Sequence, residues 1–293
     1  MNTKTKSWDD VLFQILVNGL LVSILIIVII PMWKVLMMSV TPLNFIDTKT
    51  FGLWLAPWKW SIEAYKQLVS HPSFLRATAN SSIITLGGMT INMLLTVPFA
   101  YALSNPRLPG RKFFITMVMI PFLFNAGLIP TYLVVQKFGL VDTYWAVILP
   151  GGINIYNALV MKSFFEGLPD ELKEAARLDG ANELQVLIRV ILPLSKPILL
   201  TIGLFYAVGH WNEFFTAILY LNDAKLQPLP VLLRNILLAA NINEYVEYNA
   251  FSMASVQSIK AASVFLTMLP MVMIYPWIQR HFTKGVLLGG VKQ

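Results

Sequence analysis

The chain contains no cysteine, only three histidines and few charged residues for its length. Without cysteine, disulfide bonds, thiol catalysis and thiolate metal sites are excluded. The three histidines are scattered, so we predict no metal site. Charged residues make up 13% of the chain, against about a quarter in ordinary soluble domains. Hydrophobic residues make up 56%. One core of this size cannot hide so much apolar surface, and a bilayer is its natural solvent.

Uncharged stretches long enough to cross a bilayer recur along the chain. A spanning helix needs about 20 consecutive apolar residues. The candidate spans, the fifth of which continues past Glu213, are Val11–Trp33, Ala77–Pro106, Phe113–Gln136, Thr143–Met161, Pro197–Asn222 and Ala261–Gln279. We therefore predict an all-α integral membrane protein with six transmembrane helices. The first apolar run is longer than that of a signal peptide, so we interpret it as an uncleaved helix.

Lysine and arginine in the loops indicate how the spans are oriented, because they concentrate on the cytoplasmic side. The N-terminal tail, Ser104–Lys112, Lys162–Lys196 and the C-terminal tail carry 13 of them, against 8 in the loops of the opposite side. We therefore expect both termini in the cytoplasm. The same distribution accounts for the net charge of +7, so no nucleic-acid partner is needed.

Local signals predict two short helices in the cytoplasmic loop 166–196. Pro169 followed by two acidic residues is typical of a helix start, where the helix dipole favours negative charge. Gly180 interrupts that helix without steric cost. Asn182 with Gln185 then forms a capping-box-like start of a second helix. Pro193 is expected to end it.

Proline and glycine also interrupt two of the apolar stretches. Pro121 and Pro130 fall within the third span, and Gly151-Gly152 within the fourth. Membrane helices tolerate such breaks where neighbours or a water-filled cavity satisfy the freed backbone groups. We therefore expect the middle spans to line a water-filled cavity.

The external segment Thr41–Arg76 is rich in tryptophan. This composition fits either an interfacial aromatic belt or a surface for a partner outside the cell.

The loop 166–196 carries a sequence pattern that resembles a known signature. Glu174-Ala175-Ala176 is followed by Asp179-Gly180-Ala181 and then by Val190-Ile191-Leu192-Pro193. In a membrane protein this spacing resembles the EAA loop of ABC importer permeases. Further motifs extend the similarity to carbohydrate-type ABC permeases of the maltose-permease kind, namely Asn80-Ser81, Ala100–Ser104, Asp142–Ala146, Leu149-Pro150, Trp211–Phe214 and Gly289–Lys292. Asn125–Tyr132 is similar to a subgroup handling oligo- and polysaccharides, including alginate and other uronate polymers.

The resemblance implies a type I importer fold in which residues 1–293 form one transmembrane permease domain, with core spans at about 77–280. It implies a subunit of the bacterial cytoplasmic (inner) membrane that imports an oligo- or polysaccharide. Its partners would be a second homologous permease, two cytosolic ATP-binding subunits and an extracytoplasmic solute-binding protein. ATP and Mg²⁺ would be bound by those partners, and no cofactor by this chain. The residues implied to couple to the ATPases are Glu174, Ala175, Ala176, Asp179, Gly180 and Pro193, joined by Leu287, Gly289 and Gly290 of the C-terminal tail.

Two groups of polar residues are candidates for the translocation pathway. Asn154, Tyr156 and Asn157 follow the glycine pair of the fourth span, and asparagine offers both a donor and an acceptor to sugar hydroxyls. The alternative is that they form ordinary interhelical hydrogen bonds. Asn212 and Glu213 lie in the fifth span, where an acid is costly enough to suggest a function. Glu213 would otherwise lie near the outer interface or pair within the bundle.

Two other classes of protein remain to be weighed. A stand-alone secondary transporter or channel for a polar solute would show inverted repeats and several buried acids, whereas the sequence offers no convincing repeat and one such acid. A membrane enzyme would need a cluster of histidine, cysteine or carboxylate residues within the spans. No catalytic constellation of this kind is visible, so we predict a transport subunit without an enzymatic step of its own.

Overall fold

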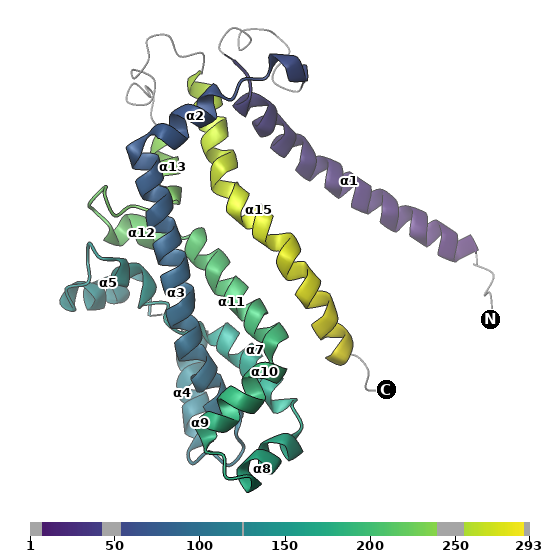
Figure 1. The fold of residues 1–293 in the computed structure, drawn as a ribbon, viewed down its shortest axis with the longest axis vertical. Coiled ribbons are helices and arrows are strands. Elements are labelled where there is room, and N and C mark those ends of the chain that lie inside the picture. Colours follow the sequence, from purple (N-terminus) through teal and green to yellow (C-terminus); the bar gives the residue numbers. More distant parts are fainter. Residues whose placement is uncertain (1–7, 43–53, 125, 239–254, 290–293) are drawn as a thin grey trace. The chain divides into compact units, whose positions relative to one another are not determined.

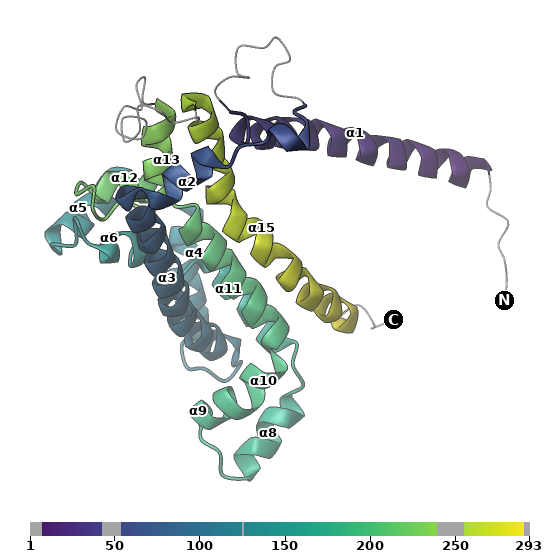
Figure 2. The same cartoon turned by 45° about the horizontal axis from the view of Figure 1, so that its top comes forward.

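The structure, a computed structural model, describes residues 8–42, 54–124, 126–238 and 255–289. These residues form helices and no β-strand, which confirms the prediction of an all-α membrane protein. Figures 1 and 2 show these helices. The chain divides into two compact units. The first contains residues 1–71 and 235–268, and the second residues 72–234 and 269–293. Helices α13 (Leu229–Leu238) and α15 (Val256–Gly289) each contribute residues to both.

The first unit is built around α1 (Trp8–Ser39), a 3-10 turn (Pro57–Lys59) and α2 (Glu63–Ser70). Ser39 at the end of α1 shares a 2.6 Å hydrogen bond with the hydroxyl of Tyr65 on α2. Most of α1 is apolar and exposed, as expected for a helix whose solvent is lipid.

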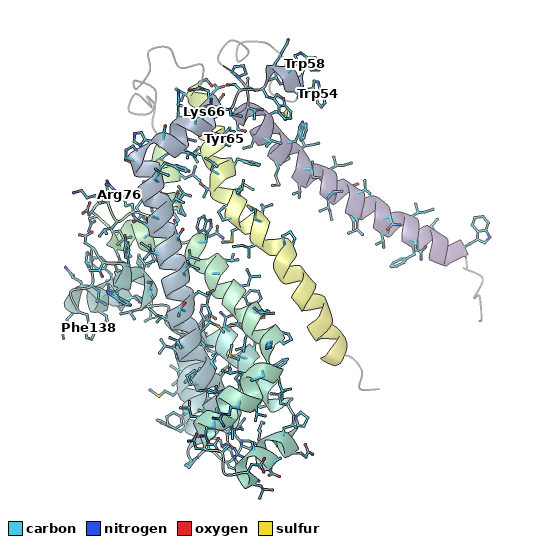
Figure 3. The ribbon with its side chains drawn as sticks, in the orientation of Figure 1. Trp54, Trp58, Tyr65, Lys66, Arg76 and Phe138 are labelled. Atoms are coloured by element: carbon cyan, nitrogen blue, oxygen red, sulfur yellow. The ribbon has the colours of Figure 1, made fainter. Side chains whose placement is uncertain are left out.

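Two tryptophans of the predicted external segment lie beside the end of α1. Trp54 stacks on Trp33 with ring centroids 6.4 Å apart, and Trp58 is 83% exposed (Figure 3). Stacking joins the segment to α1 and leaves Trp58 uncovered. Both interpretations of the aromatic segment fit this arrangement.

The second unit contains most of the helices. In chain order they are α3 (Pro72–Ser104), α4 (Arg111–Leu123), α5 (Leu128–Lys137), α6 (Tyr144–Ile148), α7 (Ile155–Glu166), α8 (Asp170–Leu178), α9 (Glu183–Val186), a π-helical turn (Leu187–Ile191), α10 (Leu192–Leu194), α11 (Lys196–Trp211) and α12 (Phe215–Tyr220). The long helix α3 packs against α7 and α11. Their shared apolar core continues into the α8–α10 segment through Val186, Leu187 and Ile191.

The described helices reproduce the predicted spans with different degrees of continuity. Three are long and apolar enough to cross a membrane, and up to five if each of two bent pairs counts as one span. The third predicted span is bent by 113° between α4 and α5, so its break falls between Pro121 and Pro130. The fourth is not one helix, because α6 and α7 are separated at Gly151-Gly152.

The first turns of α3 hold the loop that precedes α13. The amide of Asn80 donates to the backbone carbonyls of Lys225 and Gln227 at 2.8 and 3.0 Å. Its carbonyl oxygen accepts a 2.8 Å hydrogen bond from the hydroxyl of Tyr144. Since Asn80 is only 4% exposed, its amide satisfies polar groups that water cannot reach.

Replacing Asn80 with alanine is therefore expected to destabilise this unit. The substitution leaves buried carbonyls and a tyrosine hydroxyl unpaired, at a cost of about 2 kcal/mol. The melting temperature should fall by roughly 4–8 °C, as measured by thermal unfolding of the purified protein in detergent. Ser82→Ala is the matched control, because the Ser82 hydroxyl bonds only to the carbonyl of Thr78 in its own helix. Equal melting temperatures for the two variants would contradict the assignment.

Candidate functional site

The predicted hairpin is present at one end of the second unit, where α8, α9 and α10 follow one another (Figures 1 and 2). Helix α8 starts after Pro169, with acidic residues in its first turn, as predicted. Lys173 is 7% exposed and its ammonium donates to Asp170 at 2.9 Å and to the carbonyl of Phe165 at 3.3 Å. Its hydrogen bond and positive charge lower the pKa of the Asp170 carboxyl.

A Schellman motif ends α8 and explains the Asp179-Gly180-Ala181 sequence. Gly180 has φ +86°, a left-handed conformation that glycine adopts without steric cost. Its N–H donates to the carbonyl of Arg177, and the N–H of Ala181 donates to that of Ala176, both at 3.0 Å. These two bonds satisfy carbonyls that the helix end would leave free. The turn is therefore a defined corner.

The second arm begins with the predicted capping box. The side chain of Asn182 accepts from the N–H of Gln185 at 2.9 Å, and the Gln185 side chain accepts from the N–H of Asn182 at 2.9 Å. A π-helical turn follows, and the arm ends at Leu194, one residue later than predicted from Pro193. The N–H of Leu192 bonds to the carbonyl of Leu187, five residues back. An α-helix would pair it with the carbonyl four residues back, so the hydrogen-bond pattern changes just before Pro193. The chain then bends by 87° into α11.

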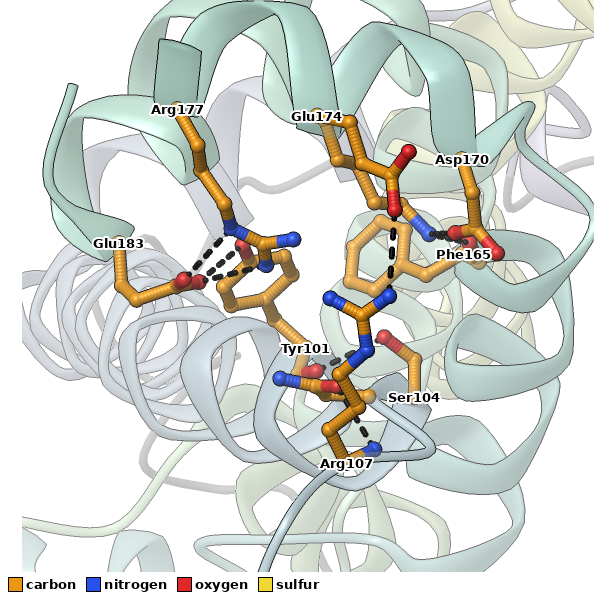
Figure 4. Close-up of polar contacts among 10 residues, drawn as sticks. Tyr101, Ser104, Arg107, Phe165, Asp170, Glu174, Arg177 and Glu183 are labelled. Carbon is orange, nitrogen blue, oxygen red and sulfur yellow. Dashed lines mark hydrogen bonds and ion pairs between the residues drawn. The ribbon is translucent and has the colours of Figure 1, made fainter. Parts of the chain in front are cut away.

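Polar side chains tie the hairpin to the end of α3 (Figure 4). The carboxylate of Glu183 accepts from Tyr101 at 2.8 Å and from Arg177 at 2.9 and 3.3 Å. The Arg177 hydrogen bond lowers the pKa of the Glu183 carboxyl. Arg107, in the basic turn after α3, pairs with Glu174 at 3.2 Å. These contacts and the apolar core hold both arms against one transmembrane helix, and they surround a polar cavity of about 270 Å³.

Much of the hairpin surface is exposed, and part of that surface is apolar. Glu174 and Ala175 are exposed, whereas Ala176 is half-buried against the core. Leu178 is 89% exposed and Leu184 63%. Exposed large apolar side chains on a polar loop make this surface a candidate protein interface. The arrangement can thus bind a partner on one face and transmit force to α3 and α11 through the other.

The candidate pathway residues lie at two breaks. Asn154 caps α7 by accepting from the N–H of Asn157 at 3.1 Å, Asn157 is buried, and Tyr156 is 56% exposed. Asn212 donates to a carbonyl of its own helix, and Glu213 accepts from the N–H of Thr216. The structure therefore brings the first three together. It gives the other two a local role at the corner between α11 and α12.

Sequence reasoning missed the residues that anchor the hairpin. In the sequence, Arg107 counted only among the cations of the loop Ser104–Lys112, and Tyr101 was included only in the motif Ala100–Ser104. No local pattern identifies Tyr101 as a partner of Glu183, because the two lie 82 residues apart.

In the C-terminal tail, α15 stays helical through Leu287 to Gly289, while Gly290 lies outside the described residues. Among the described residues, no group of three or more potential ligands is placed to hold a metal ion.

Apolar helices with an anchored two-helix hairpin fit the membrane-spanning part of a transporter. The chain belongs to the family of binding-protein-dependent transport system inner membrane components, whose model matches residues 89–287. It is therefore a transport permease subunit and not an enzyme. Membership favours the permease interpretation over a stand-alone transporter or channel.

Individual relatives match almost the whole chain. The polygalacturonan/rhamnogalacturonan transport system permease protein YtcP of Bacillus subtilis is 39% identical over 96% of this chain and 98% of its own length. Protein LplC of the same organism is 42% identical over 82% of each chain. A crystal structure of a bacterial ABC transporter involved in the import of the acidic polysaccharide alginate contains a chain with 30% identity and a TM-score of 0.89, over 96% of this chain and all of that one.

The anchor of the hairpin predicts a local rather than a global response to Glu183→Gln. Exposed ion pairs contribute only about 0.2–1 kcal/mol, and the side chain of Glu183 is 58% exposed. The melting temperature should change little. Amides of residues 170–190 should exchange with deuterium several-fold faster, because the hairpin opens more often from α3. Glu171→Gln, at an exposed acid on α8 of the same hairpin, is the control. Identical exchange in both variants would show that Glu183 does not hold the hairpin.

Proposed function

We propose that this chain is one of two homologous permease subunits of an ATP-driven ABC importer of oligo- or polysaccharides. Its hairpin 166–196 docks a cytosolic ATP-binding subunit, and an extracytoplasmic solute-binding protein delivers the solute to the opposite side. ATP and Mg²⁺ are bound by the ATP-binding subunits. Both termini lie in the cytoplasm of a bacterial cell, and residues 1–293 act as one permease domain.

The observation that carries this proposal is the two-sided construction of the hairpin. Ala175, Leu178 and Leu184 are exposed, while Val186, Leu187 and Ile191 are packed into the core shared by α3, α7 and α11. Closure of two ATP-binding subunits would displace the exposed side. Because packed interiors behave as close-packed solids, the displacement would pass to the spans without being lost in a flexible loop.

Two of the relatives described above name their solutes, and these names suggest a solute class. YtcP carries polygalacturonan or rhamnogalacturonan in its name, and the structural relative is involved in import of the acidic polysaccharide alginate. We infer an oligosaccharide of the uronate type as the solute. Cations in predicted external loops support this, because Arg76, Lys137, Lys225 and Arg234 are all exposed; Figure 3 shows Arg76 at the start of α3.

Two further elements complete the proposal. Asn154, Tyr156 and Asn157, with Asn212 and Glu213, contribute to the pathway. The tail residues Leu287, Gly289 and Gly290 contact the ATP-binding subunits.

The overall test is purification of the complex and its reconstitution into liposomes. A purified complex without an ATPase, or one whose ATP hydrolysis responds to no saccharide, would refute the function.

Gly180 offers a graded test of the coupling role. A Cβ atom at Gly180 would meet nothing within 4 Å, so a substitution acts through backbone strain of about 1–2 kcal/mol. Asparagine tolerates the left-handed conformation better than alanine. Saccharide-stimulated ATP hydrolysis per assembled complex should therefore decrease in the order glycine, asparagine, alanine, leucine, while the protein still inserts into the membrane.

Gly139→Ala is the matched control for this series. Gly139 has φ +67° and open space around its Cβ position, so alanine there incurs similar strain away from the hairpin. The control should retain its stimulated ATP hydrolysis. Full coupling in Gly180→Leu would contradict the docking role of the hairpin.

The charge of the solute can be tested with oligosaccharides of equal length. Uronate oligomers should stimulate ATP hydrolysis more than neutral ones, and the preference should weaken at high salt because screening shortens the range of the external cations. Lys225→Gln should reduce the preference, whereas Lys112→Gln, on the predicted cytoplasmic side, should not. Equal stimulation by both oligomers would argue against an acidic solute.

A further inference from the structure

The break of the fourth span, residues 149–154 between α6 and α7, frees backbone groups that a continuous helix would pair. In a membrane each unpaired group costs several kcal/mol, so such a break persists only where something else satisfies it. Two side-chain contacts do so here, one at each side of the break. Both connect it to the same two helices, α3 and α11.

The first contact is made by Tyr206 of α11. Its hydroxyl accepts from the N–H of Asn154 at 3.0 Å and shares a 2.7 Å hydrogen bond with the hydroxyl of Thr96 on α3. Tyr206 is 5% exposed and Thr96 is fully buried. A single phenol group therefore joins the start of α7 to both neighbouring helices.

The second contact is made by Asn92 of α3. Its amide nitrogen lies 3.2 Å from the carbonyl oxygen of Gly151 and 3.1 Å from Nε2 of His210 on α11. With one amide hydrogen directed to each acceptor, Nε2 of His210 carries a lone pair. Asn92 is 1% exposed, so water does not compete for these bonds.

The sequence of α3 makes room for this arrangement. A Cβ atom on Gly88, one helical turn before Asn92, would lie 2.5–2.8 Å from three ring atoms of His210. Only glycine permits the imidazole at this position. The neighbouring Gly87 would meet only one atom, at 4.0 Å. The space at Gly88 is thus specific to the His210 contact and is not a general property of a glycine pair.

We propose that Tyr206 and Asn92 are positioning residues that fix the break 149–154 to α3 and α11. They hold Asn154 and Tyr156 as a wall of the solute pathway that moves together with these two helices. The inference rests on the proposed function for the pathway, but the fixation itself is a property of this chain alone. Loss of either contact should let residues 149–154 separate from α3 and α11. Because α11 directly follows the hairpin in the chain, movement of the hairpin would then no longer reach Asn154 and Tyr156.

The absence of cysteine from the chain permits a direct test in membranes that contain the full complex. Ala158→Cys places a thiol in α7 where the side chain is 2% exposed, and Ala64→Cys places one at an equally buried position of α2. A water-soluble maleimide reports opening of either site. Tyr206→Phe, which keeps the ring and removes the hydroxyl, should raise labelling of Cys at 158 about fivefold and leave Cys at 64 unchanged.

Gly88→Ala should raise labelling at 158 in the same way, because it displaces His210, while Gly87→Ala should not. Saccharide-stimulated ATP hydrolysis per assembled complex should fall in Tyr206→Phe with basal hydrolysis retained. Unchanged labelling at 158, an equal rise at position 64, or undiminished stimulation would each overturn the proposal. A parent complex that responds to no saccharide would refute the proposed function, while the labelling would still decide whether the break is fixed.

Discussion

One row of residues on α3 supplies hydrogen bonds at the places where the helices of the second unit are interrupted. The row repeats every four residues, and all its members are buried: Asn80, Ile84, Gly88, Asn92, Thr96, Ala100 and Ser104. Side chains at this spacing form one ridge on the helix surface. Its polar members hold the loop before α13 and both sides of the break in the fourth span. A membrane protein cannot leave such groups to water, so the fold depends on a polar stripe inside an apolar helix.

Sequence reasoning was strongest where the determining residues are close together in the chain. The start after Pro169, the turn at Gly180 and the capping box at Asn182 are all local, and the structure confirms each. The glycine pair 151–152 indicated the break of the fourth span for the same reason. A short backbone signal is sufficient where the residue itself imposes the conformation.

The contacts that give these features their role are long-range and escaped prediction. Asn92 and His210 lie 118 residues apart, and Asn80 binds a loop about 145 residues away. Hydrophobic periodicity does not register them, because α3 is apolar on several faces and its polar row is too sparse to change the pattern. The prolines of the third span indicated its break, but the fifth span was predicted to be continuous, whereas the structure interrupts it between Trp211 and Phe215. Composition measures apolar length and not a bend that no proline or glycine marks.

Contacts of two very different strengths hold the hairpin. Val186, Leu187 and Ile191 are at most 6% exposed and fix the second arm by apolar burial, which is costly to undo. The pair between Arg107 and Glu174 is different, since their side chains are 78% and 53% exposed. Exposed pairs contribute about 1 kcal/mol at most. Under the proposed docking role, a cation of the ATP-binding subunit would therefore replace Arg107 at little cost, while the core beneath would keep the hairpin on the transmembrane helices.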